Sequence, residues 1–141
     1  MRIVLPAIAL LLTCGGIARS DGAASADGGG SELKLAADVS ITTAISVEAL
    51  KRTFRDPRPV GSGYAFPSGH ATLAFGLARV ASHYHPERRT LWYALAAGVA
   101  WSRVRTRAHT WDDVIAGAAL GSWIGDAAVA RGGILLVSVG W

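Results

Sequence analysis

Three glycines recur every four residues along the apolar stretch from Thr110 to Ala130, at Gly117, Gly121 and Gly125. Residues four apart share one face of an α-helix, so these glycines leave a smooth groove on which a second helix can pack closely. Thr110 and Asp113, before the apolar run, have the Ser/Thr-x-x-acid spacing of a helix start. The chain therefore has to contain a helix in close contact with another helix.

The remaining apolar residues also follow helical rather than alternating spacing. They predict helices within residues 32–54, 68–84 and 86–102, the first ended by Pro57 and the second by Pro86. No stretch alternates as a strand would. We therefore predict an all-α fold, a compact helical bundle.

The first 31 residues predict a targeting segment and a linker. Arg2 precedes an apolar run over residues 3–12, which is shorter than the roughly 20 residues of a transmembrane helix. We expect a signal peptide over residues 1–18, with cleavage as late as residue 26 as the other option, and a flexible Gly/Ala/Ser/Asp linker over residues 19–31. The folded domain then covers residues 32–141, and the protein is exported to the periplasm. The single cysteine, Cys14, excludes an intramolecular disulfide and leaves lipidation as an open alternative.

Positive charge gathers in the middle of the chain. The whole sequence has a net charge of +4, but between Lys51 and Arg107 ten basic residues face only Asp56 and Glu87. Leu, Ala and Gly lie between these arginines, where a nucleic-acid-binding surface would carry exposed aromatic or amide side chains. We therefore expect no nucleic-acid partner, and a small anion held by converging cations instead.

Three short motifs indicate what that anion is. Lys51 precedes Arg58 by seven positions, Ser68-Gly69-His70 opens a predicted helix, and Arg103 precedes His109 and Asp113. The lysine and arginines supply permanent positive charge, and a helix N-terminus directs N–H donors at an anion. Two histidines can serve as nucleophile and general acid, and a carboxylate four positions after a histidine can orient its ring. Together these groups suit phosphoryl transfer.

The pattern resembles the type 2 phosphatidic acid phosphatase (PAP2) superfamily, which includes bacterial acid phosphatases, membrane lipid phosphatases and vanadium haloperoxidases. All eight signature positions match in order: Lys51, Arg58, Ser68, Gly69, His70, Arg103, His109 and Asp113. The resemblance implies a bundle of the PAP2/haloperoxidase type, here a small version with few helices before the first motif.

The resemblance also implies the chemistry, a hydrolysis in two steps without metal or cofactor. His109 would attack phosphorus to form a phosphohistidine, Asp113 would orient it, and His70 would protonate the leaving oxygen. Lys51, Arg58, Ser68, Gly69 and Arg103 would hold the phosphoryl oxygens. The expected substrate is a phosphomonoester or pyrophosphate, either a phosphorylated small molecule or a lipid phosphate such as phosphatidic acid or polyprenyl pyrophosphate.

Several alternatives remain open at this point. Taken alone, Asp113 is also consistent with a role only as the capping partner of Thr110. A metal site could be formed by His70, His109 and Asp113, although three nearby cations disfavour a metal. A vanadate-dependent haloperoxidase and a non-catalytic anion- or lipid-binding module are the competing functions. Residues 71–101 are too few for two membrane spans. Membrane contact and a homo-oligomer stay open.

Overall fold

The computed structural model describes residues 28–58, 60 and 62–135. These residues form α2 (Gly28–Phe54), α3 (Gly69–Tyr84), the short 3-10 helix η1 (Pro86–Arg88), α4 (Arg89–Arg105) and α5 (Trp111–Arg131). Within those ranges the only extended pairing is an isolated bridge between Pro57 and Tyr64. The all-α prediction is confirmed. The predicted signal peptide and the linker up to residue 27 lie outside the described residues.

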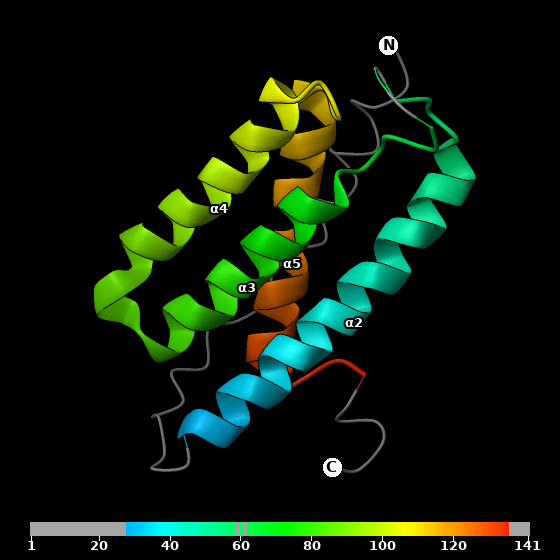
Figure 1. Cartoon of the computed structure of the whole chain (residues 1–141). Helices are drawn as coiled ribbons and strands as arrows, with labels where there is room; N and C mark the ends of the chain where they lie inside the picture. The colour runs from blue at the N-terminus through cyan, green and yellow to red at the C-terminus, as the bar shows by residue number, and fades with distance from the viewer. Residues whose placement is uncertain (1–27, 59, 61, 136–141) are drawn as a thin grey trace.

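Helix α3 lies in the middle of the bundle, with α2 on one side, α4 on the other and α5 behind it (Figure 1). The end of α2, the start of α3, the end of α4 and the start of α5 all lie at the same end of the molecule (Figure 1). The three sequence motifs occupy these four helix ends. The connectivity therefore brings them to one end of the bundle.

The glycine stripe of α5 packs directly against the backbone of α3. A Cβ atom built on Gly121 would lie 2.0 Å from the carbonyl oxygen of Thr72, and one on Gly117 would lie 2.7 Å from that of Ser68. Gly125 faces the carbonyl oxygen of Gly76 in the same way, at 2.9 Å. Any side chain at these positions would push the two helices apart. The close packing predicted from the glycine spacing is confirmed, and α3 is the partner helix.

Below this contact the apolar side chains of α2, α3 and α5 form the main core. Its buried members are Leu35, Val39, Val47, Val80, Leu120, Ile124 and Ala128. The buried carboxylate of Asp38 accepts hydrogen bonds from the backbone N–H groups of Ile134 and Leu135, at 2.6 and 2.8 Å. These bonds fasten the segment after α5 to α2.

Helix α2 begins four residues before the expected start at Glu32, inside the segment predicted as linker. Its first turns are held by contacts with the rest of the bundle. Leu35 is buried in the core, and the Glu32 carboxylate lies 3.3 Å from Nε2 of His85 in the α3–α4 connection. Tertiary contacts of this kind outweigh the weak helix propensity of glycine.

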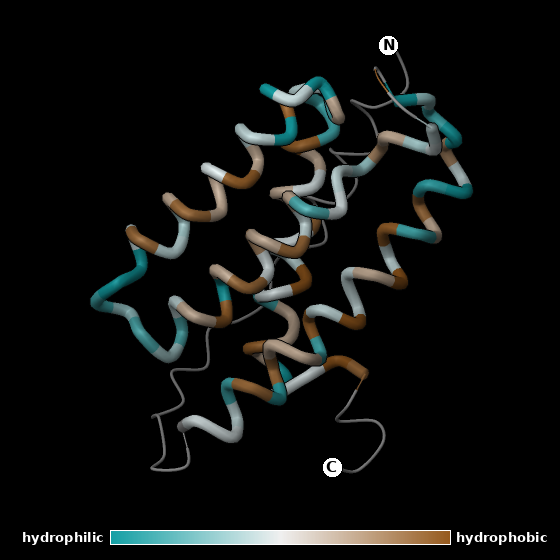
Figure 2. Tube along the Cα trace, in the orientation of Figure 1, coloured by the Kyte–Doolittle hydropathy of each residue, from teal (hydrophilic) through white to brown (hydrophobic). Residues whose placement is uncertain are grey.

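Apolar side chains also lie on the surface. Trp101, Trp111 and Trp123 are exposed. Figure 2 shows a hydrophobic middle section of α4 between hydrophilic stretches at its two ends.

Among the described helices, α5 has the length and apolar composition to cross a membrane, and 56% of that stretch is buried inside the bundle. A core helix of a soluble protein has the same properties.

Candidate active site

His109 and Asp113 lie at the start of α5, where the helix cap holds the carboxylate. Asp113 Oδ2 accepts a hydrogen bond from the backbone N–H of Thr110 at 2.7 Å, and Thr110 Oγ1 accepts one from the N–H of Asp113 at 3.4 Å. This is a capping box, in which two residues satisfy free N–H groups of the first turn. The same Oδ2 atom lies 3.5 Å from Nδ1 of His109. The carboxylate therefore caps the helix and contacts the histidine.

Both side chains of this pair are almost completely buried, with 4% of the His109 side chain and 2% of the Asp113 side chain exposed. Burial alone would raise the pKa of Asp113. The adjacent His109 ring and the hydrogen bonds with Thr110 outweigh that effect and hold the pKa of Asp113 below its ordinary value. Asp113 is therefore ionised at neutral pH, with its charge next to the imidazole.

The loop between α4 and α5 brings Arg103 next to His109. The backbone N–H groups of Ala108 and His109 both donate to the carbonyl oxygen of Arg103, at 3.1 and 3.2 Å. Arg107, within this loop, has a positive φ of 56°, which lets the chain turn sharply. The Arg103 guanidinium is partly buried, and its Nε donates to Ser102 Oγ at 3.2 Å.

The start of α3 is joined to the start of α5. The backbone N–H of Ser68 donates to the carbonyl oxygen of Asp113 at 3.0 Å, and Ser68 itself is fully buried. Its Oγ atom has no hydrogen-bond partner within the described part of the chain. Gly69 and His70 follow in the first turn, where helix N–H groups lack partners within the helix. A free hydroxyl and free amides here suit an anion.

Arg58 is positioned by the loop between α2 and α3. Its Nε donates to the carbonyl oxygen of Tyr64 at 3.4 Å, and its backbone N–H donates to that of Gly63 at 3.3 Å. The N–H of Ala65 donates to the carbonyl oxygen of Asp56 at 2.7 Å. These bonds fold the loop back on itself after α2, with Lys51 in the last turn of that helix.

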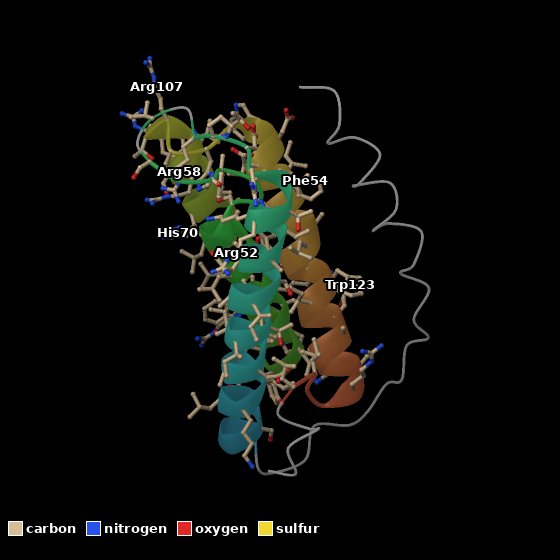
Figure 3. The ribbon with its side chains drawn as sticks, turned by 90° about the vertical axis from the view of Figure 1, so that its right-hand side faces the viewer. Arg52, Phe54, Arg58, His70, Arg107 and Trp123 are labelled. Atoms are coloured by element: carbon tan, nitrogen blue, oxygen red, sulfur yellow. The ribbon has the colours of Figure 1, made fainter. Side chains whose placement is uncertain are left out.

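Electrostatic effects connect the side chains from all four helix ends. The pKa of His70 is lowered first by desolvation and then by the positive charges of Arg103, His109, Lys51 and Arg58. The pKa of Lys51 is also lowered, by burial and by Arg58, while Glu48 and Asp113 act in the opposite direction. Figure 3 shows Arg58 and His70 on the same side of the bundle, away from Trp123.

The structure thus brings all eight predicted residues to one end of the bundle, and it connects them to different degrees. Asp113 has direct contacts with His109 and Ser68, and Arg103 with His109. His70 and Lys51 share the site through charge effects.

Other residues near these eight have contacts of their own. Arg52 pairs with Glu48, and Arg105 stacks on Trp101. Val47, which belongs to none of the three motifs, has a side-chain atom 3.3 Å from where a Cβ on Gly69 would be. Its helical spacing marks it only as a core residue. Among the described residues, no group of three His, Cys, Asp or Glu side chains is arranged to hold a metal ion.

The family model described as the PAP2 superfamily matches residues 60–130, which is half of the chain. The matched range includes Ser68, Gly69 and His70 as well as Arg103, His109 and Asp113, and it starts after the first motif. No curated protein and no solved structure matches the chain.

Proposed function

Because the chain belongs to the PAP2 superfamily, whose members are generally phosphatases, we propose that it is an exported, metal-independent phosphatase acting on a phosphomonoester or pyrophosphate. The observation that carries this proposal is the buried contact of 3.5 Å between His109 Nδ1 and Asp113 Oδ2. A carboxylate at Nδ1 favours the tautomer with its proton on that atom, which leaves the Nε2 lone pair free.

In the first step, Nε2 of His109 attacks phosphorus while the bond from phosphorus to the leaving oxygen breaks. The electron pair goes to that oxygen, which takes a proton from His70. The product is a phosphohistidine whose positive ring is stabilised by the adjacent Asp113. In the second step, water attacks phosphorus, His70 accepts the water proton, the P–N bond breaks and inorganic phosphate leaves.

The phosphoryl oxygens are held by groups from three elements. Lys51 and Arg58 come from the end of α2 and its loop, and Arg103 comes from the end of α4. Ser68 Oγ, buried and without a partner in the described residues, donates from the start of α3 together with the Gly69 amide. Preorganised donors and cations of this kind stabilise the charge that develops on the oxygens in the transition state.

The substrate class we favour includes lipid-linked phosphates, such as phosphatidic acid or a polyprenyl pyrophosphate. Exposed apolar side chains on α4 support membrane contact, because Leu91, Leu95 and Val99 recur every four residues on one face of the helix and are 37–55% exposed. This part of the proposal is separate from the chemistry. A soluble phosphate ester would use the same eight residues.

The test is hydrolysis of p-nitrophenyl phosphate by the purified protein in excess EDTA, with vanadate as inhibitor. We expect activity that survives EDTA, falls with vanadate and is lost in His109→Ala. In His70→Ala, the good leaving group still departs but water is not activated, so a phosphoprotein should accumulate and be detected by mass spectrometry on the peptide containing His109. Activity that depends on a divalent metal would contradict the mechanism. Phosphate binding without turnover of any ester would instead favour the binding module.

A further inference from the structure

An apolar groove of about 250 Å³ runs between α3 and α4. On α3 its wall begins one turn after the candidate general acid His70 and follows the same helix face, at 4, 7, 8 and 11 positions further along. These residues are Ala74, Leu77, Ala78 and Ala81. This spacing repeats on a helix face, so the α3 wall starts one turn from the phosphate site and runs along the helix for roughly 10 Å.

The α4 wall has the same relation to another site residue. It precedes Arg103 on one helix face, at 4, 7, 8 and 11 positions before it, with the members Val99, Ala96, Leu95 and Trp92. Because α3 and α4 are antiparallel neighbours, His70 and Arg103 lie at the same end of the groove (Figure 1). The groove therefore begins one helical turn away from two residues of the phosphate site.

The groove is built from small floor residues and exposed apolar rims. Ala78 and Ala96 are almost fully buried, whereas Leu95 is 55% exposed and Val99 is 37% exposed. No charged side chain lines it. Its volume is below the roughly 300–1,000 Å³ of pockets for drug-sized ligands. A slender apolar chain lying along it would cover these side chains.

We propose that this groove binds the hydrocarbon chain of a phosphate ester whose phosphate occupies the site at its upper end. The proposal rests on the proposed function and gives the lipid chain a defined location. Charge supports this occupant, since the anionic head group would lie next to Arg103 and Arg58 and the uncharged chain along the uncharged walls.

A second copy of the chain packed on α4 fits the charges less well. Arg88 and Arg89 lie at one end of the helix and Arg103 and Arg105 at the other. Two such helices side by side, in either orientation, would place arginines opposite arginines, and like charges across an interface are unfavourable. A hydrocarbon chain has no such cost.

The experiment is a series of linear alkyl phosphates from methyl to dodecyl, each used below its micelle concentration. A methylene group that becomes half to fully buried should raise kcat/KM about twofold to fourfold, and the gain should stop once the chain passes Ala81. Dissociation constants for the same series, and for inorganic phosphate, are measured by calorimetry. Geranyl and farnesyl phosphate form a second arm that distinguishes isoprenoid from acyl-type chains.

Two variants locate the chain. Leu95→Gln places a polar group on the rim and should reduce the increase per methylene. Its matched control is Ile45→Gln on the outer surface of α2, because Ile45 is 59% exposed and Leu95 is 55% exposed. The control should keep both the activity and the chain-length dependence. Ala81→Phe fills the far end of the groove and should end the gain at a shorter chain. Thermal unfolding of each variant shows that it is folded.

The outcomes separate the two proposals. Alkyl phosphates that bind more tightly as they lengthen, but are not hydrolysed, would support the groove and overturn the phosphatase. Hydrolysis with neither kcat/KM nor affinity depending on chain length would overturn the groove and leave the phosphatase intact. Equal behaviour of Leu95→Gln and Ile45→Gln would also overturn the groove, because the chain would then bind elsewhere.

Discussion

Replacement of Gly121 by alanine tests the contact on which the bundle depends. The new Cβ would lie 2.0 Å from the carbonyl oxygen of Thr72, 2.8 Å from its carbonyl carbon and 3.0 Å from its Cα. All three atoms belong to the backbone of α3, so no side-chain rotation relieves the clash. The two helices must move apart by on the order of 1 Å, and overpacking of this kind costs up to about 3 kcal/mol.

Alanine also has a higher helix propensity than glycine, which returns about 1 kcal/mol. We therefore expect Gly121→Ala to lower the free energy of unfolding by about 2 kcal/mol, and Tm by about 8 °C for a domain of this size. Gly98→Ala in α4 is the matched control, because a Cβ there meets nothing within 4 Å. It gains the propensity without the clash, so its free energy of unfolding should rise by about 0.5–1 kcal/mol.

Thermal and urea unfolding of the two variants, followed by circular dichroism, provides the comparison. Opposite signs for the two substitutions are the expected result. If Gly121→Ala were as stable as the parent or more stable, α3 and α5 could not be in backbone contact at this position, and the packing described above would be wrong.

Three further predictions concern the candidate site. Asp113→Asn should lower kcat by about 10²- to 10⁴-fold with little change in KM, because the amide no longer stabilises the charged ring of His109. Steady-state kinetics on p-nitrophenyl phosphate would check this, and an unchanged kcat would contradict the role assigned to Asp113. Thr110→Val removes the cap acceptor and should cost about 1 kcal/mol in unfolding free energy, whereas Thr110→Ser keeps it; urea denaturation of both variants distinguishes a cap from simple packing. The pKa of His70 is lowered, so the free protein loses its protonated general acid as pH rises through a value below 6.5. The alkaline limb of the kcat/KM profile should therefore lie below pH 6.5. A bound phosphate dianion raises the pKa of His70, so the alkaline limb of kcat should lie at higher pH, and coincident limbs in the two profiles would argue against His70 as the acid.

Much of the fold follows from local sequence signals. Apolar spacing and the prolines at 57 and 86 indicate where helices run and end, and the glycine stripe indicates that one helix face is in close contact. These signals do not indicate which helix packs on that face. Sequence spacing describes one helix at a time, and only the folded chain shows that Gly121 lies against Thr72.

The sequence was less informative where a residue's surroundings decide its role. Gly28 to Ser31 have the composition of a linker, yet they form the first turn of a helix held by the contacts of Glu32 and Leu35 with the bundle. A tryptophan in a helix does not indicate which face it occupies, so the exposure of Trp101 and Trp111 could not be predicted. Both features depend on tertiary contacts.

Asp113 shows how the fold and the candidate site depend on each other. The sequence offered a helix cap and an orienting carboxylate as alternatives, and the side chain has both contacts, with Thr110 at 2.7 Å and with His109 at 3.5 Å. Its carbonyl oxygen also accepts the Ser68 N–H, which joins the second motif to the third. That bond requires α3 to approach α5 closely at Ser68, where a Cβ on Gly117 would lie 2.7 Å from the Ser68 oxygen. The glycine at 117 is therefore a condition for assembling the site as well as for packing the bundle.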